Sequence, residues 1–125
     1  MATIDLTTDS FSNAVEDNNI VFVDFWAAWC GPCRAFAPVF RAASETHPDI
    51  AFGKVDTEAE QQLAAAAGIS SIPTLMAFRD QILVFSQPGA LNGPQLEQVI
   101  TAVKALDMDD IRSRIAAESV TAQGA

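Results

Sequence analysis

The sequence has no tyrosine and little cysteine, histidine or positive charge. Its 125 residues include two cysteines, one histidine and seven lysines and arginines, against sixteen aspartates and glutamates. The formal charge of −9 argues against nucleic acid or anionic membranes as partners, because their phosphates would be repelled. Two cysteines three positions apart are also too few and too close for the disulfide framework of a small secreted protein.

Long apolar runs are missing as well. No stretch approaches the roughly 20 apolar residues that cross a membrane, and the acidic first twenty residues lack the basic start and apolar run of a secretory signal. We therefore expect a cytoplasmic location. Half of the sequence is apolar and includes eight phenylalanines, which is enough for one well-buried core in a single domain.

Apolar patterning predicts an α/β fold. Strands are expected at 3–6, 20–26, 50–55, 74–78 and 82–85. A first helix is expected after the cap residues 8–10, and further helices are expected at 34–45, 61–67 and 94–106. This order predicts a mixed sheet between two helical layers, parallel in its first half and antiparallel in the final hairpin. Pro38 should bend or divide the second helix, and the turn at 79–81 lacks the glycine usual in hairpins.

The segment 20–26 is apolar on both faces except at Asp24, which is typical of a central strand covered by helices on both sides. Burial should raise the pKa of this carboxyl. Asp24 lies six residues before Cys30, where it could accept a proton from Cys33, directly or through a water. Lys54 on the next buried strand could tune Asp24 by its charge. The alternatives are a purely structural Asp24 and a Lys54 without such a role.

Cys30 and Cys33 have the spacing that thiol–disulfide exchange needs, with one thiolate to attack and a second thiol to resolve. Cys30 should lie at a helix N-terminus, where backbone N–H groups and the helix dipole favour its anion. Cys33, one turn further in, should be more enclosed. Gly31 allows the turn, and Pro32 suits the first helical turn and stiffens the pair.

Two other interpretations of the cysteine pair are weaker. A zinc site needs four ligands, and one pair with His47 as the only histidine cannot supply them within one chain. A structural staple would close a loop too short to constrain the unfolded chain much. His47, beside a proline at the end of a helix, is expected to be a surface residue.

These residues resemble the thioredoxin family. The stretch 23–33, VDFWAAWCGPC, is similar to the thioredoxin active-site segment, and Pro38 stands where thioredoxins carry a proline inside the following helix. The run 72–74 resembles the family's cis-proline loop, and 88–90 resembles its glycine-bearing loop beside the site. The resemblance spans about residues 3–106, with its motifs in the family's order.

The resemblance implies a thioredoxin fold, with a central mixed five-stranded sheet flanked by four helices. The thioredoxin domain would occupy residues 1–106, and the protein would be a monomer. Residues 107–125 lie outside the resemblance and would form a C-terminal extension, either a short helix or a disordered tail. Such an end is expected to be solvated or frayed, and docking to the domain or to a partner is the alternative.

The resemblance also implies roles for individual residues. Cys30 would be the nucleophile, Cys33 the resolving thiol and Asp24 the buried acid–base. The peptide bond before Pro73 would be cis and would place the backbone of Ile72 against Cys30. An apolar docking surface would consist of Trp29, Gly31, Ile72 and Gly89.

The implied function is the reduction of protein disulfides. Electrons would come from NADPH through a flavin-containing thioredoxin reductase, and the chain itself would hold no cofactor and no metal. The Gly-Pro pair between the cysteines resembles the reducing members of the family. A dedicated reductant for one client is an alternative within the same chemistry. A binding or scaffold module that uses the surface around Trp29 and Pro73 without redox turnover is an alternative of another class.

Overall fold

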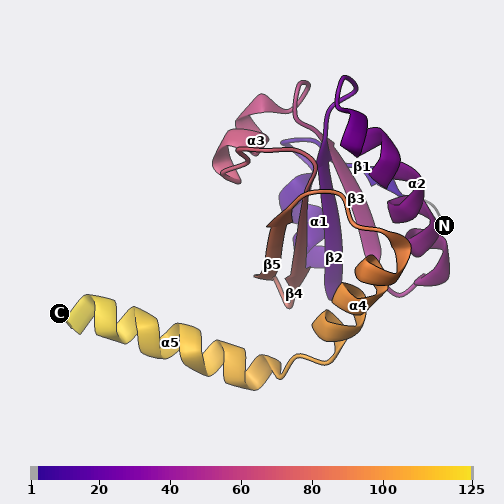
Figure 1. The fold of residues 1–125 in the computed structure, drawn as a ribbon. Helices are drawn as coiled ribbons and strands as arrows, with labels where there is room; N and C mark the ends of the chain where they lie inside the picture. Colours follow the sequence, from indigo (N-terminus) through magenta and orange to yellow (C-terminus); the bar gives the residue numbers. More distant parts are fainter. Residues whose placement is uncertain (1–2, 125) are drawn as a thin grey trace.

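Five strands form one sheet in the order β1-β3-β2-β4-β5 (Figure 1). The structure is a computed structural model that describes residues 3–124, with side chains as far as Glu118. The strands are β1 (Ile4–Asp5), β2 (Ile20–Trp26), β3 (Ala51–Asp56), β4 (Thr74–Arg79) and β5 (Ile82–Pro88). β1 and β2 run parallel to β3, whereas β4 is antiparallel to β2 and β5. The predicted mixed sheet is therefore confirmed, with the predicted central strand at its middle.

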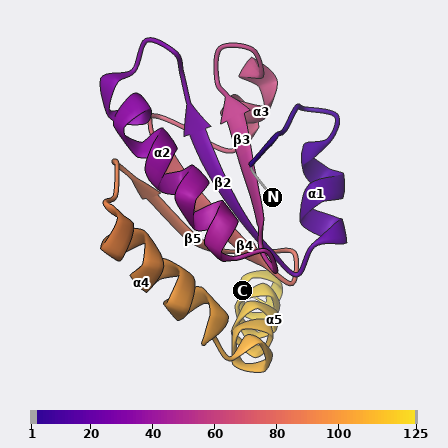
Figure 2. The ribbon, with the colours of Figure 1, turned by 90° about the vertical axis from the view of Figure 1, so that its right-hand side faces the viewer.

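Helices cover both faces of this sheet (Figures 1 and 2). One face carries α2 (Gly31–Thr46) and α4 (Gly93–Lys104), and the other carries α1 (Phe11–Asp17) and α3 (Gln61–Ala66). A fifth helix, α5 (Met108–Gly124), follows the four that the resemblance implies. The layered thioredoxin fold expected from the sequence is confirmed.

The two faces of β2 belong to separate apolar clusters. Phe22 packs with Phe36 and Phe40 of α2, whereas Val23 and Phe25 belong to the cluster beneath α1 and α3. Because side chains alternate along a strand, Asp24 lies on the same face as Phe22, beneath α2. β2 thus places the Asp24 carboxyl on the face of the sheet that is covered by α2, the helix that carries the cysteines.

Two features singled out in the sequence, Pro38 and the hairpin turn without glycine, take these forms in the structure. Pro38 lies inside α2 but does not divide it. The hairpin turn contains no glycine, and both Asp80 (φ 53°) and Gln81 (φ 68°) adopt the left-handed region. Aspartate tolerates this region better than most residues, and the Asp80 amide donates to the Asn19 carbonyl oxygen at 2.9 Å. The turn is therefore held by a contact to the start of β2.

The extension after Leu106 begins as an anchored helix. The Asp107 carboxylate accepts the Asp110 amide at 3.1 Å, Met108 is buried, and Arg112 pairs with Asp80 at 3.0 Å. Beyond these contacts α5 leads away from the sheet (Figure 1). Within the described residues, no helix has both the length and the apolar character that a membrane crossing requires.

Candidate functional site

Cys30 and Cys33 form a disulfide at the N-terminus of α2, with their Cα atoms 5.2 Å apart. Cys30 is the N-cap residue, and its Sγ accepts the backbone N–H of Cys33 at 3.1 Å. Pro32 lies in the first helical turn, where a missing N–H leaves no intrahelical bond unmade. Both cysteines are buried, Cys30 at 4% and Cys33 at 2% exposure. The helix terminus therefore directs the Cys33 N–H at the Cys30 sulfur, an arrangement that stabilises a thiolate.

Two distant loops meet beside Cys30. The carbonyl oxygen of Ile72 lies 3.7 Å from Cys30 Sγ, and the Ile72–Pro73 peptide bond is cis, as the resemblance implied. The Gly89 amide donates to the Pro73 carbonyl oxygen at 2.8 Å, with Gly89 in a positive-φ conformation (φ 104°) that other residues rarely adopt. The fold thus brings the 72–74 segment to the cysteine pair and the 88–90 segment to that loop.

A groove of about 610 Å³ opens beside the disulfide. Cys30 lines it and Cys33 does not, so Cys30 is the sulfur that a molecule in the groove would meet first. Trp29, 66% exposed, forms part of its wall. The full lining is Trp29, Cys30, Gly31, Pro32, Thr57, Glu58, Gln61, Ala64, Ala65, Ile69, Ser70, Ser71 and Ile72.

Not every residue expected at the site lines this groove. Pro73 and Gly89 lie just outside it, joined to each other by the hydrogen bond described above. Asp24 and Lys54 are also absent from its wall. The expected residues therefore separate into a groove surface around Cys30 and a pair of charged groups within the sheet.

Asp24 is completely buried, and neither carboxylate oxygen has a hydrogen-bond partner among the described residues. Burial raises the pKa of Asp24 from 3.8 to about 6, and the positive charge of Lys54 opposes this rise. Lys54 stands directly opposite Asp24 in the β2–β3 register. The raised pKa agrees in direction with the expectation from the sequence, and a tuning role for Lys54 stays a prediction.

Lys54 also contacts the aromatic surroundings of the cysteines. Its Nζ lies 5.0 Å from the ring centroid of Trp26, a cation–π distance. Trp26 in turn packs against the small apolar cluster of Ala27, Cys30 and Cys33. Lys54 therefore interacts both with the buried Asp24 carboxyl, through its charge, and with Trp26, which packs against the cysteines.

His47 is more enclosed than the surface position expected from the sequence. Its side chain is only 16% exposed, and Nε2 lies 2.8 Å from the Glu97 carboxylate of α4. Packing of α4 against α2 explains the difference, since local sequence does not reveal which helices are neighbours. Across residues 3–124, no group of three or more His, Cys, Asp or Glu side chains could hold a metal ion.

Sequence reasoning missed the far wall of the groove, which α3 and the loop before it supply. Thr57 positions this loop, because its N–H and Oγ1 both donate to the Trp26 carbonyl oxygen at 2.9 and 3.0 Å. A signal was available. The segment 56–60 follows β3, and parallel neighbours β2 and β3 end at the same edge, so the loops after both must lie close together.

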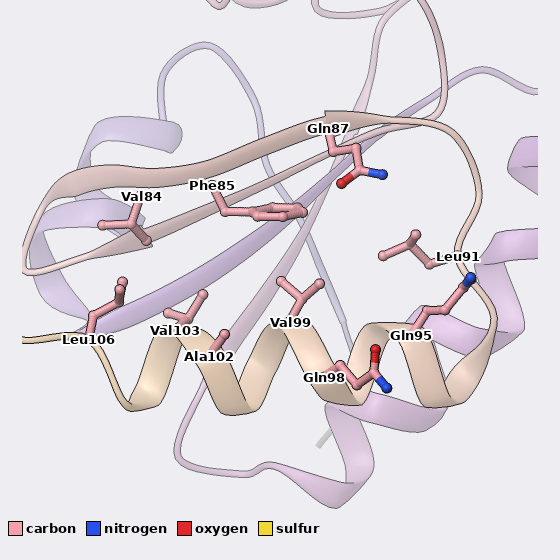
Figure 3. A pocket seen from close by; sticks show the side chains of 10 residues that line it. All are labelled: Val84, Phe85, Gln87, Leu91, Gln95, Gln98, Val99, Ala102, Val103 and Leu106. Carbon is pink, nitrogen blue, oxygen red and sulfur yellow. The ribbon is translucent and has the colours of Figure 1, made fainter.

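A second groove, of about 370 Å³, lies between β5 and α4. Figure 3 shows side chains from the strand and the helix pointing toward one another across it. Its lining is Val84, Phe85, Gln87, Leu91, Gln95, Gln98, Val99, Ala102, Val103 and Leu106. None of these side chains is a thiol or an ionisable group.

Comparisons with known protein families and with individual relatives agree with the thiol–disulfide chemistry that the cysteine pair indicates. The Thioredoxin family model matches residues 2–102. A protein named putative thioredoxin 2 from Streptomyces coelicolor is 52% identical over 121 residues, covering 97% of this chain and 90% of the relative. That alignment includes most of the segment after Leu106, which the family model does not reach. A thioredoxin from Porphyra purpurea is 41% identical, covering 80% of this chain and 95% of its own.

Solved structures of similar shape are thioredoxins as well. A mutant thioredoxin from Halobacterium salinarum NRC-1 superposes with a TM-score of 0.78 at 31% identity, covering 84% of this chain and 93% of that chain. The oxidised mitochondrial thioredoxin 3 from Saccharomyces cerevisiae gives 0.74 at 30% identity, covering 80% of this chain and 94% of its own. Sequence and structure thus lead to one family.

Proposed function

We propose, because this chain belongs to the thioredoxin family of thiol–disulfide oxidoreductases, that it reduces disulfides in a range of client proteins and is recycled by a thioredoxin reductase. One observation carries the proposal. A disulfide closes the N-terminus of α2, and only one of its two sulfurs lines the adjoining groove. That asymmetry suits a pair in which Cys30 attacks and Cys33 resolves.

The proposed reaction begins from the reduced pair. The Cys30 thiolate attacks one sulfur of a client disulfide, so that a Cys30–client bond forms, the client bond breaks and one client thiolate leaves. Cys33 then loses its proton and attacks Cys30 Sγ, which re-forms the Cys30–Cys33 disulfide and releases the second client thiolate. Two electrons have passed from this chain to the client. A flavin-containing thioredoxin reductase would return them from NADPH.

Asp24 is the proposed proton acceptor for Cys33. A carboxyl whose pKa is about 6 is largely ionised at neutral pH, yet it is basic enough to take a proton. Its oxygens have no partner among the described residues that would have to be released first. Lys54 would limit the rise of the Asp24 pKa and so keep the acceptor charged.

The proposed docking surface comprises Trp29, Gly31 and Ile72 around Cys30, with Gly89 behind the loop that carries Pro73. Extended client chain could pair with the backbone near Ile72 while its cysteine reaches Cys30. Pro32 would hold the two cysteines in register. We assign this unit to residues 1–106 and treat 107–125 as an extension.

A reducing compartment follows from the proposed cycle, since a dithiol that donates electrons must be returned to its reduced form. We therefore propose a cytoplasmic location and a role in electron transport and cell redox homeostasis. The two cysteines are fully used by the redox pair, and no further disulfide would have to persist.

Insulin reduction with dithiothreitol tests the proposal. The wild type should accelerate it, and Cys30→Ser should reduce the rate to that without protein. Asn92→Ser is a matched control, because it places the same residue at the cap of α4, away from the cysteines, and should leave the rate unchanged. Equal rates for wild type and Cys30→Ser would contradict the proposal.

Client breadth has its own test. Cys33→Ser should trap mixed disulfides between Cys30 and clients in a reducing-compartment extract. Many trapped proteins support a general reductant, and a single trapped species supports a dedicated one. A Cys30→Ala, Cys33→Ala variant that restores every cellular function would instead favour a binding module without redox turnover.

A further inference from the structure

The groove beside Cys30 carries one ionisable side chain. Among its thirteen lining residues, Glu58 alone has a charged carboxylate, and the others apart from the disulfide-bonded Cys30 are apolar, small or neutral polar. Glu58 is on the loop that Thr57 ties to the end of β2. A client segment entering the groove therefore meets one negatively charged side chain in the lining.

The backbone of Glu58 is held on both sides while its carboxylate is free to bind. The Glu58 N–H donates to Asp56 Oδ1 at 2.9 Å, and the Glu58 carbonyl oxygen accepts Gln61 Nε2 at 3.2 Å. The carboxylate makes no hydrogen bond or ion pair with any residue of the described part of the chain. Glu58 thus presents an unengaged acceptor from a fixed position.

Neighbouring charges do not neutralise it. Asp56 Oδ1 accepts backbone amides of its own loop, and Glu60 accepts the Thr8 amide at 2.8 Å, so both acids are occupied and both add to the negative field. Arg34 does not line the groove: its guanidinium donates to the Ala28 carbonyl oxygen at 2.8 Å and lies near Gly31. Glu58 is therefore the one charged group among the residues that line the groove.

We propose that Glu58 is a specificity-determining residue that selects client segments with a lysine or arginine within about three residues of the attacked cysteine. The inference rests on the proposed function, because it concerns which clients reach Cys30. A basic side chain in the groove gains an ion pair with Glu58, whereas an acidic one meets repulsion. The expected preference is roughly 5-fold in kcat/KM, since one exposed ion pair is worth little more.

The test uses reduced full-length protein and a set of disulfide-containing peptides. Within each set only one position near the cysteine varies, as lysine, glutamine or glutamate, and the position is moved across the three residues on either side. We expect at least one position where lysine exceeds glutamate by roughly 5-fold, with the ratio shrinking as salt screens the charge. Equal rates at every position would overturn the inference.

Three variants assign the preference to Glu58. Glu58→Gln should compress the lysine-to-glutamate ratio toward one, and Glu58→Lys should invert it. Glu45→Gln removes the same charge from an exposed position near the C-terminal end of α2 and should preserve the wild-type ratio. A wild-type ratio retained in Glu58→Gln would overturn the inference. Failure of the wild type to reduce any peptide would instead contradict the proposed function.

Discussion

Two helices on the same face of the sheet begin with the same local design. α2 starts at Cys30-Gly31-Pro32-Cys33, and α4 starts at Asn92-Gly93-Pro94-Gln95. In each, the cap side chain accepts the backbone N–H three residues later, Cys30 Sγ at 3.1 Å and Asn92 Oδ1 at 2.9 Å. Each proline occupies the first turn, where its missing N–H is harmless.

The environments of the two caps differ. Asn92 is exposed, and Gln95 completes a capping box by accepting the Asn92 N–H at 2.9 Å. Cys30 is buried, bonded to Cys33 and placed 3.7 Å from the Ile72 carbonyl oxygen. The same arrangement of cap residue, glycine and proline therefore stabilises the start of α4. In α2, where the cap is a buried cysteine, it also holds the redox pair.

The largest expected effect separates chemistry from capping at α2. Cys30→Ser and Cys30→Ala should both abolish insulin reduction. Serine is a good cap and alanine is a poor one, so Cys30→Ser should be more stable than Cys30→Ala by about 1 kcal/mol. Urea denaturation under reducing conditions measures the difference. Equal stabilities would mean that the Cys30 side chain contributes no capping.

The variant Asp24→Asn tests whether the cysteine pair at the start of α2 needs a proton acceptor. The cap of α4 has no thiol and needs none. Asp24→Asn should slow disulfide reduction by about 10-fold or more near neutral pH, because Cys33 loses its proposed base. Stopped-flow measurements between about pH 6 and 9 provide the check. Unchanged rates over this range would leave Asp24 with a structural role only.

The same variant makes a prediction about stability. The folded pKa of Asp24, about 6, lies above its ordinary value of 3.8, so the folded state holds this proton more tightly. The stabilisation is complete below about pH 4 and is lost as the pH rises through 6, a change of roughly 3 kcal/mol. Asp24→Asn should lack this fall in the free energy of unfolding. A pH profile parallel to wild type would contradict the assignment.

A smaller effect is expected at the α4 cap. Asn92→Ala should lower the free energy of unfolding by about 1 kcal/mol, whereas Asn92→Asp should retain most of the stability. Insulin reduction should be unchanged in both variants, since Asn92 lies outside the cysteine groove. Loss of activity in Asn92→Ala at a temperature where it stays folded would break the distinction between the two termini.

The smallest effect concerns the second half of the capping box. Gln95→Ala removes the acceptor for the Asn92 N–H and should cost about 0.5 kcal/mol. Chemical denaturation of Gln95→Ala and Asn92→Ala under the same conditions shows which of the two lowers the free energy of unfolding more. A cost above that of Asn92→Ala would mean that Gln95 stabilises α4 mainly through another contact.

Local sequence was sufficient for most elements because their signals lie within a few residues of one another. The apolar run 20–26 predicted β2, and the Asn-Gly-Pro run predicted the start of α4. The hairpin was predicted although its turn lacked glycine, and the reason that the turn works is tertiary: Asp80 is tied to Asn19 and Arg112. His47 is more enclosed than expected for the same kind of reason, since its side chain pairs with Glu97 of α4.

The sequence by itself determined the chemistry of this protein: two cysteines at the spacing of one helical turn, a Gly-Pro pair that starts the helix between them, and one acid in an apolar strand. These are local facts, decided by backbone sterics and side-chain type. Only the tertiary structure decided that Asp24, opposite Lys54, has no hydrogen-bond partner among the described residues, that Ile72 reaches Cys30, and that Glu58 lines the groove. Each of these depends on which strands are neighbours, and packing of the whole chain sets that order.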